Sequence, residues 1–341
     1  MPLLVQNLKW HKAAVGKVEG GHGRCCPLAS VPRRWNPLLL RTGHGGMLRK
    51  SSSLSGGATS ANFEARVGRE KAMAKEQLFL DAYQPRQIAR RVEQMGVAKA
   101  QADVLTLLLL AVLAGAFISL GALLFTVIVT DSPLGFGVTR LLGGLGFCLG
   151  LVLVVVGGAE LFTGNNLLAM AWASRLIGSR ALLRNWCLAY LGNVIGCLGT
   201  LLLVLWADIA GMGGGAVGET ALHIARSKAD LSLLEAFSRG ILSNVLVCLA
   251  VWLAMGGRSV SDKILAVLLP ISAFVTIGFE HSIANWFFLP YGLILDGEGL
   301  MSFSGIGRNL LAVTLGNVVG GTLLVAGVYW LAYLRGEPRQ P

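Results

Sequence analysis

Six apolar stretches constrain the fold of this chain more than any other feature. A helix of about 20 residues crosses a hydrocarbon core of about 30 Å, and inside a bilayer the backbone polar groups must bond within the protein. No alternating pattern of about ten residues, typical of a membrane β-barrel, is present. The sequence therefore predicts an all-α membrane protein with six transmembrane helices, near residues 104–130, 137–165, 184–207, 238–256, 263–292 and 308–334.

Composition and charge support this class. The chain is 54% hydrophobic and 14% charged, well below the roughly 25% of charged residues in soluble domains. Its formal net charge is +11, but residues 1–72 hold 12 Lys and Arg against three Glu, a surplus of nine. The basic charge belongs mainly to this segment, so it does not indicate a nucleic-acid partner for the membrane body.

Four regions follow from this distribution. Residues 1–72 are predicted to be a disordered basic leader; it is either an over-long start, because Met73 resembles an initiator, or an organellar signal. Residues 73–103 form a predicted cytoplasmic segment with an interfacial helix. Residues 104–336 form the predicted six-span transport domain, and 337–341 a cytoplasmic tail.

Positive charges in the short loops predict the orientation. Lys and Arg precede the first span, follow the second and the fourth, and occur after the sixth, whereas Asp131, Asp296 and Glu298 lie in the loops after the first and fifth spans. Both termini are therefore expected in the cytoplasm, with the protein in a bacterial inner membrane.

Two motifs occur twice. "GAELFTGN" (158–165) and "GFEHSIAN" (278–285) share G-x-E-x-x-x-x-N, and "RNWCLAYLGNVIG" and "RNLLAVTLGNVVG" share R-N and L-G-N-V at the same spacing. Because each repeat holds three spans, the two repeats are predicted to have opposite orientations in the membrane. The second and fifth spans, which contain the Gly and polar residues, are predicted to be interrupted.

The glutamate and the asparagine that occur in both motifs are expected to form hydrogen bonds where the second and fifth spans are interrupted. Glu160 and Glu280, with Asn165 and Asn285, are interpreted as internal hydrogen-bonding groups. His281 has no equivalent, because Leu161 occupies its position in the first motif. An ionisable group inside a membrane indicates a substrate pathway, and imidazole titrates near neutral pH.

These motifs resemble the formate/nitrite transporter family over about residues 76–336. The resemblance is carried by "GGAELFTGNN", "LGNVIG", "GFEHSIANWFFLP" and "LGNVVGG", in that order. It implies an aquaporin-like six-span protomer, assembly into a homopentamer and one anion pore per protomer. Glu160, where formate channels have Asp, and Trp286, where Met is commoner, depart from the family pattern.

The resemblance also implies the pathway residues. His281 corresponds to the central pore histidine, Thr163 to its partner in the loop that interrupts the second span, and Asn317 to a polar neighbour. Apolar constrictions and vestibule lysines that attract anions correspond to Phe147, Leu151, Leu161, Phe274, Lys228 and Lys99.

The predicted function is transport of formate, coupled to protons through His281. Nitrite, hydrosulfide and lactate are alternative substrates. A neutral-solute channel of aquaporin type lacks its paired N-P-A signature here. An intramembrane hydrolase is disfavoured because adjacent residues such as Glu280, His281 and Ser282 point in different directions on a helix. No metal-ligand spacing or cofactor motif occurs, and the four cysteines within the spans are expected to be buried free thiols.

Overall fold

The computed structural model describes residues 63–69 and 82–336. The predicted tail 337–341, most of the predicted leader and residues 73–81 of the predicted cytoplasmic segment lie outside the described residues. Within the leader, residues 63–69 form a helix, which differs from the disorder predicted for that part.

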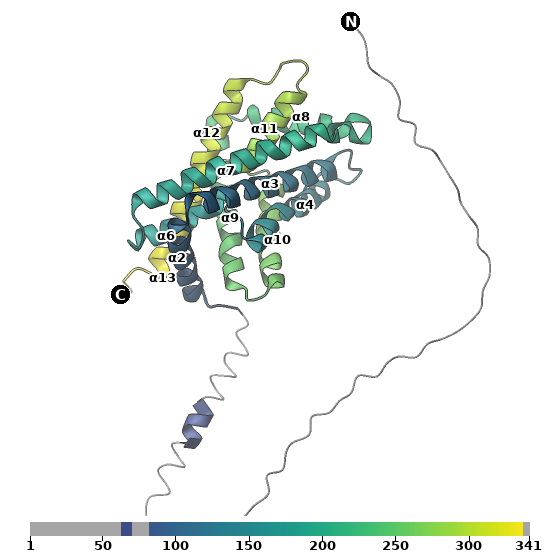
Figure 1. The fold of residues 1–341 in the computed structure, drawn as a ribbon. Helices are drawn as coiled ribbons and strands as arrows, with labels where there is room; N and C mark the ends of the chain where they lie inside the picture. Colours follow the sequence, from purple (N-terminus) through teal and green to yellow (C-terminus); the bar gives the residue numbers. More distant parts are fainter. Residues whose placement is uncertain (1–62, 70–81, 337–341) are drawn as a thin grey trace, which may run out of the picture. The chain divides into compact units, whose positions relative to one another are not determined.

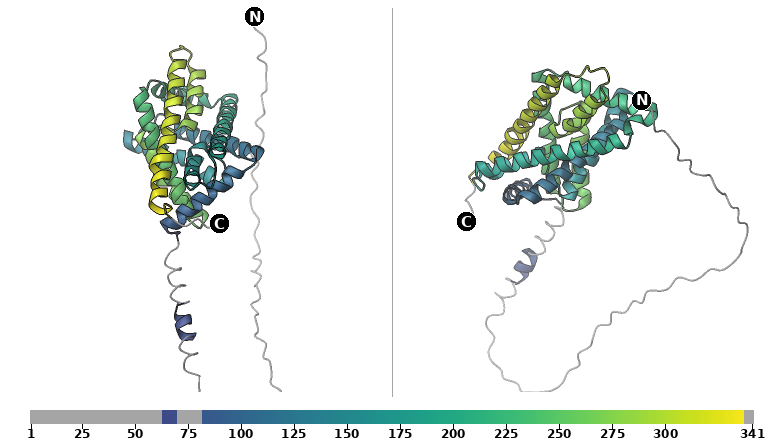
Figure 2. Two further views of the ribbon diagram at one scale, coloured as in Figure 1. Left: turned by 90° about the vertical axis from the view of Figure 1, so that its left-hand side faces the viewer. Right: turned by 45° about the horizontal axis from the view of Figure 1, so that its top comes forward.

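The described residues form an all-helical structure (Figure 1). Six helices in this part of the chain are long and apolar enough to cross a membrane, as the hydrophobic pattern predicts. The last of the six is a continuous rod made of α12, η3 and α13, which Figure 2 shows from two sides. The elements are α2 (Pro85–Gln101), α3 (Val104–Val129), α4 (Phe136–Gly157), α5 (Phe162–Asn165), η1 (Asn166–Leu168), α6 (Ala169–Ala173), α7 (Ser179–Trp206), η2 (Ile209–Gly215), α8 (Ala216–Ala229), α9 (Leu233–Gly256), α10 (Val260–Ile277), α11 (Ser282–Leu295), α12 (Phe303–Val319), η3 (Gly320–Gly327) and α13 (Val328–Tyr333).

Short polar residues begin the long helices. Asp103 accepts a hydrogen bond from the Thr106 amide at the start of α3, and Ser302 caps α12 in the same way. Ser232 and Ser259 form capping boxes at the starts of α9 and α10. These side chains satisfy backbone N–H groups that have no partner inside the helix.

Two of the long helices end at a glycine in the left-handed region. Gly158 follows α4 with φ +78°, and Gly278 follows α10 with φ +88°. A side chain would be strained there, which is why glycine occupies both positions. Residues 158–161 and 278–281 then lie outside any helix before α5 and α11 begin. Thr163, predicted in a loop, lies instead within the short helix α5.

Glycines also let the helices approach closely. α3 packs against α4 and α7, α9 packs against α10 and α12, and α4 packs against α10. An added Cβ at Gly196 would clash with the Val112 carbonyl, and one at Gly320 with the Ile241 carbonyl. Seven glycines in α4, α12 and η3 have close neighbours inside the chain: Gly143, Gly144, Gly146, Gly150, Gly316, Gly320 and Gly321.

The cysteines correct one prediction. Cys148, Cys197 and Cys248 are buried free thiols, as expected, but Cys187 is exposed. Cys187 lies on the outward face of α7 with Leu183 and Leu191, which are also exposed. Helical periodicity places residues four apart on the same face, so this face of α7 is not covered by the described part of the chain.

The predicted interfacial helix corresponds to α2. Ile88 and Val92 are buried and Met95 is half-buried, in accord with the predicted apolar face. This face packs against a cluster that includes Leu167, Met170 and Trp252. α2 is therefore fixed to the helical body, which brings Lys99 near its C-terminal end to the site described next.

Candidate functional site

The first polar network surrounds Glu160. Its Oε1 lies 3.1 Å from Lys99 Nζ, and its Oε2 accepts a hydrogen bond of 2.8 Å from Asn165 Nδ2. Lys99 also donates to Asn165 Oδ1 at 2.9 Å. Asn185 accepts from Asn165 Nδ2 and donates to the Lys99 carbonyl. Every member is tied to at least two others, which is what a buried charge requires.

The second network repeats this arrangement around Glu280. Glu280 Oε1 lies 2.9 Å from Lys228 Nζ, and its Oε2 accepts from Asn285 Nδ2 at 2.7 Å. Asn309 accepts from Asn285 at 2.8 Å and donates to the Lys228 carbonyl at 2.8 Å. The expected role of Glu160, Glu280, Asn165 and Asn285 as hydrogen-bonding groups agrees with these contacts, although the sequence did not predict the lysine partners.

Two further asparagines hold the non-helical segments. Asn193 accepts from the Phe162 amide and donates to the carbonyls of Glu160 and Ala111. Asn317 accepts from the Ser282 amide and donates to the carbonyls of Glu280 and Gly240. Backbone groups freed where α4 and α10 end are thereby satisfied by side chains of α7 and α12.

His281 joins the two halves of the chain. Its Nε2 lies 2.9 Å from Thr163 Oγ1, and its Nδ1 accepts a hydrogen bond from the Ala284 amide, capping α11. A backbone N–H can only donate, so the neutral imidazole carries its proton on Nε2 and donates it to Thr163. His281 and Thr163 are 3% and 0% exposed. The two residues thus lie together, as the resemblance implied.

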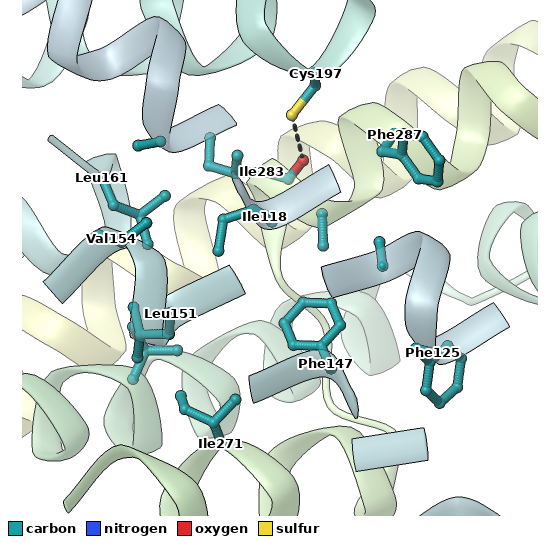
Figure 3. Packing of buried hydrophobic residues seen from close by; sticks show 14 of the residues in the cluster. Ile118, Phe125, Phe147, Leu151, Val154, Leu161, Cys197, Ile271, Ile283 and Phe287 are labelled. Atoms are coloured by element: carbon teal, nitrogen blue, oxygen red, sulfur yellow. Dashed lines mark hydrogen bonds between the residues drawn. The ribbon is translucent and has the colours of Figure 1, made fainter. Parts of the chain in front are cut away.

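Apolar side chains flank this pair. The rings of Phe147 and Phe274 meet edge to face with centroids 5.5 Å apart, and the Phe274 centroid lies 6.1 Å from that of His281. Leu151 and Leu161 are each 2% exposed. In Figure 3, Leu151, Val154 and Leu161 stand together, apart from Phe147.

Two cavities lie in different parts of the chain, and one of them is lined by His281. The Lys228 cavity, about 220 Å³, is lined by Phe147, Phe274, Lys228 and His281, among others. The Lys99 cavity, about 190 Å³, is lined by Leu151, Leu161, Lys99 and Glu160, among others. Thr163 and Asn317 line neither of these two cavities, and Asn317 directs its polar atoms to the backbone. Its contacts are those of a positioning residue.

An ion-pair cluster lies outside the spans. Arg226 on α8 pairs with Asp296 and Glu298 in the loop after α11. The hydrogen bond from Arg226 and the amide of Met301 lower the pKa of Asp296 below its ordinary value. This contact holds α8, which carries Lys228, to the end of α11.

The sequence missed several of these partners. Asn185, Asn193 and Asn309 occur in the repeated R-N and L-G-N patterns, which were the available signal, but the patterns do not reveal what the side chains bind. Arg140, which donates to the carbonyls of Val275 and Thr276 at the end of α10, gave no signal because it lies outside the repeated motifs.

The geometry of the described residues does not support hydrolysis or metal binding. Glu280 faces Lys228 and Asn285, while His281 faces Thr163, and the Ser282 hydroxyl has no hydrogen-bond partner in the described part of the chain. These three adjacent residues therefore form no relay for hydrolysis. In the same part of the chain, no group of three His, Cys, Asp or Glu side chains is placed to hold a metal ion.

Six apolar helices, together with two cavities that each contain a lysine paired with a buried glutamate, define a multi-pass membrane protein of the channel and transporter class. The family model for formate/nitrite transporters matches residues 86–331. The chain belongs to the formate/nitrite transporter family.

Similar proteins agree with this assignment. Formate channel FocA of Escherichia coli strain K12 is 39% identical over 274 residues, covering 75% of this chain and 96% of that protein. The probable formate transporter of Methanothermobacter thermautotrophicus is 37% identical over 268 residues, with 74% and 97% covered. A solved structure described as a pentameric formate channel with formate bound has a TM-score of 0.62 and 36% identity, covering 68% of this chain and 98% of that one. An ion channel of the same family has a TM-score of 0.66 and 28% identity, with 72% and 98% covered.

Proposed function

We propose that this chain is a channel for small monovalent anions of weak acids and that formate is its main substrate. The observation that carries the proposal is the position of His281, which bonds Thr163 and lines the Lys228 cavity beside Phe147 and Phe274. The relatives described as formate channels favour formate over nitrite, hydrosulfide and lactate.

The proposed mechanism follows from the cost of moving charge through apolar surroundings. A bare anion loses its hydration at the apolar side chains, which costs many kcal/mol. Low polarity raises the pKa of a carboxylic acid, so formate in this environment favours its neutral form. The Nε2–H of His281, now donated to Thr163 Oγ1, is the group that donates a hydrogen bond to the passing anion. Transfer of a proton to the anion would require the imidazolium, because a neutral ring that lost its Nε2 proton would become an imidazolate. Forming the imidazolium protonates Nδ1, which would break the bond with the Ala284 amide.

The proposed architecture is an inverted 3+3 repeat with the second and fifth spans interrupted. Its support is the set of glutamate, lysine and asparagine contacts that the two networks share, together with the left-handed glycines Gly158 and Gly278. Both termini are proposed to be cytoplasmic in a bacterial inner membrane, and the assembly a homopentamer. Cysteine labelling that placed the loop before α7 and the loop after α11 on the same side of the membrane would contradict this topology.

His281 is the position that tests the mechanism. Purified wild-type protein, His281→Phe and His281→Asn should be compared for labelled formate flux in liposomes over a pH series. His281→Phe removes both hydrogen bonding and titration, so flux coupled to acid should fall by at least tenfold. His281→Asn retains hydrogen bonding alone, so it should pass the anion with a weaker pH dependence.

His223→Asn is the matched control, because His223 lines the Lys228 cavity but lies on α8, away from Thr163. It should retain the wild-type pH profile. Unchanged rates and pH profiles in both His281 variants would reduce His281 to a structural residue. If nitrite permeates while formate neither permeates nor competes, formate is not the substrate. If water or glycerol permeates as fast as formate, the neutral-solute channel is favoured.

A further inference from the structure

The Lys228 cavity contains more positive than negative charge. Its lining includes Arg140, Lys228 and Arg239, whereas Glu280 is the single carboxylate among the described residues that line it. The three cations differ in what they already bind. That difference decides which of them is available to a ligand.

Lys228 and Arg140 are occupied by the protein. The Lys228 ammonium lies 2.9 Å from Glu280 Oε1, so its charge is neutralised locally. Arg140 donates from Nη2 to the Val275 carbonyl and from Nε to the Thr276 carbonyl at 3.2 Å. Its guanidinium carbon also lies 5.4 Å from the centre of the Phe125 ring. Arg140 adds to the positive field of the cavity, but two of its donors point at backbone carbonyls.

Arg239 lies beside both residues and is bound differently. It is half-buried on α9, and its carbonyl accepts the Glu280 amide at 3.3 Å, which fixes its backbone next to the second network. Its guanidinium makes no hydrogen bond and no ion pair with the residues that the structure describes. Glu235, one turn earlier, attracts it electrostatically, but the Glu235 carboxylate accepts hydrogen bonds from Ser232.

Arg239 also breaks the equivalence between the two halves. In the first half, the carbonyl that accepts the Glu160 amide belongs to Leu110. The backbone contact is therefore duplicated, while the side chain is apolar in one copy and a guanidinium in the other. The contact explains the backbone position but gives no reason for the charge.

We propose that Arg239 is an anion-binding residue of the Lys228 cavity, where its guanidinium holds a small carboxylate or oxyanion before the anion reaches Phe147 and Phe274. The planar guanidinium offers paired N–H donors that match a carboxylate. Lys228, paired with Glu280, then has mainly a structural role. This inference rests on the proposed function, since it concerns the same permeating anion.

Formate influx into liposomes containing the full chain tests this residue. Wild type, Arg239→Gln and Arg239→Lys should be compared over a formate concentration series at low and high ionic strength. For Arg239→Gln at low salt, the half-saturating concentration should rise roughly fivefold, the order expected for the loss of one charge several ångströms from the anion. Maximal flux should stay within about twofold, and high salt should reduce the difference.

Two variants serve as controls. Arg180→Gln removes an exposed arginine on α7 that lines neither cavity and should leave the half-saturating concentration unchanged. Glu235→Gln removes the acid that attracts Arg239 but keeps a side chain that suits a capping box, so it should lower that concentration. Arg239→Lys keeps the charge and should remain within about twofold of wild type.

A binding measurement separates this inference from the proposed function. Formate should raise the thermal unfolding temperature of purified wild type and raise it less in Arg239→Gln. Equal stabilisation of the two proteins, or no stabilisation of wild type, would overturn the role of Arg239. A wild type that is stabilised by formate through Arg239 but carries no flux would overturn the channel function alone.

Discussion

The halves around Glu160 and Glu280 share most of their bonds, yet in the described part of the chain a histidine follows Glu280 and a leucine follows Glu160. In each, a lysine and an asparagine hold the glutamate, and a second asparagine joins the first to the lysine carbonyl. His281 and Leu161 occupy equivalent positions after those glutamates. The comparison teaches that the contacts holding each glutamate are duplicated, whereas the imidazole beside Glu280 has no counterpart beside Glu160.

The networks also differ in how completely they are satisfied. Lys99 donates to both Glu160 and Asn165, whereas Lys228 reaches Glu280 and leaves the buried Asn285 Oδ1 without a partner in the described part of the chain. The second network is also less exposed, with side-chain values of 15% for Lys228 and 5% for Glu280 against 22% and 11% in the first. Its charges therefore depend more strongly on one another.

The largest expected effect follows from removing each lysine. Lys228→Met leaves a carboxylate buried without its cation, which costs about 3–5 kcal/mol of unfolding free energy. Lys99→Met should cost less, because Glu160 is more exposed. The double variant Lys228→Met with Glu280→Gln should recover most of the loss. Unfolding in detergent measures all three, and an equal or larger loss for Lys99→Met would break the comparison.

Equivalent glycines test whether the halves pack alike. Gly196→Ala and Gly320→Ala each place a Cβ against a backbone carbonyl of the neighbouring helix, so each should cost about 1–3 kcal/mol. Gly199→Ala is the matched control on α7, since an added Cβ there meets nothing within 4 Å. Thermal unfolding should show similar losses for the first two variants and none for the control. A large difference between Gly196→Ala and Gly320→Ala would show that the halves do not pack equivalently.

The smallest expected effect concerns the ion pair between Arg226 and Asp296, which holds α8 and its Lys228 to the end of α11. Arg226 lowers the pKa of Asp296 in the folded protein. The pair therefore stabilises the fold above the ordinary Asp pKa, and this contribution is lost as pH falls through the lowered value. Arg226→Gln should flatten the loss of stability below about pH 4. If Arg226→Gln and wild type lose stability equally at acidic pH, the Arg226–Asp296 pair does not contribute to the pH dependence of stability.

Much of the fold could be predicted from the sequence because its signals are local. Apolar length identified the six long helices, and the two G-x-E motifs lie where α4 and α10 end at left-handed glycines. The lack of a repeat equivalent for His281 was also visible, because Leu161 occupies its position in the first motif. The exposure of Cys187 was not predicted, because a thiol in an apolar run gives no sign of whether lipid or protein surrounds it.

The sequence by itself determined the spans, the duplicated motifs and the replacement of His281 by Leu161 in the first motif, since each depends on neighbouring residues or on spacing. Only the tertiary structure decided that Lys99 and Lys228 are paired with glutamates, which atoms join His281 to Thr163, and that Arg239 keeps its guanidinium unpaired in the described part of the chain. Three of these contacts join residues that are 52 to 118 positions apart. The packing of the helices brings such residues together, and no local pattern records which cation a buried carboxylate meets.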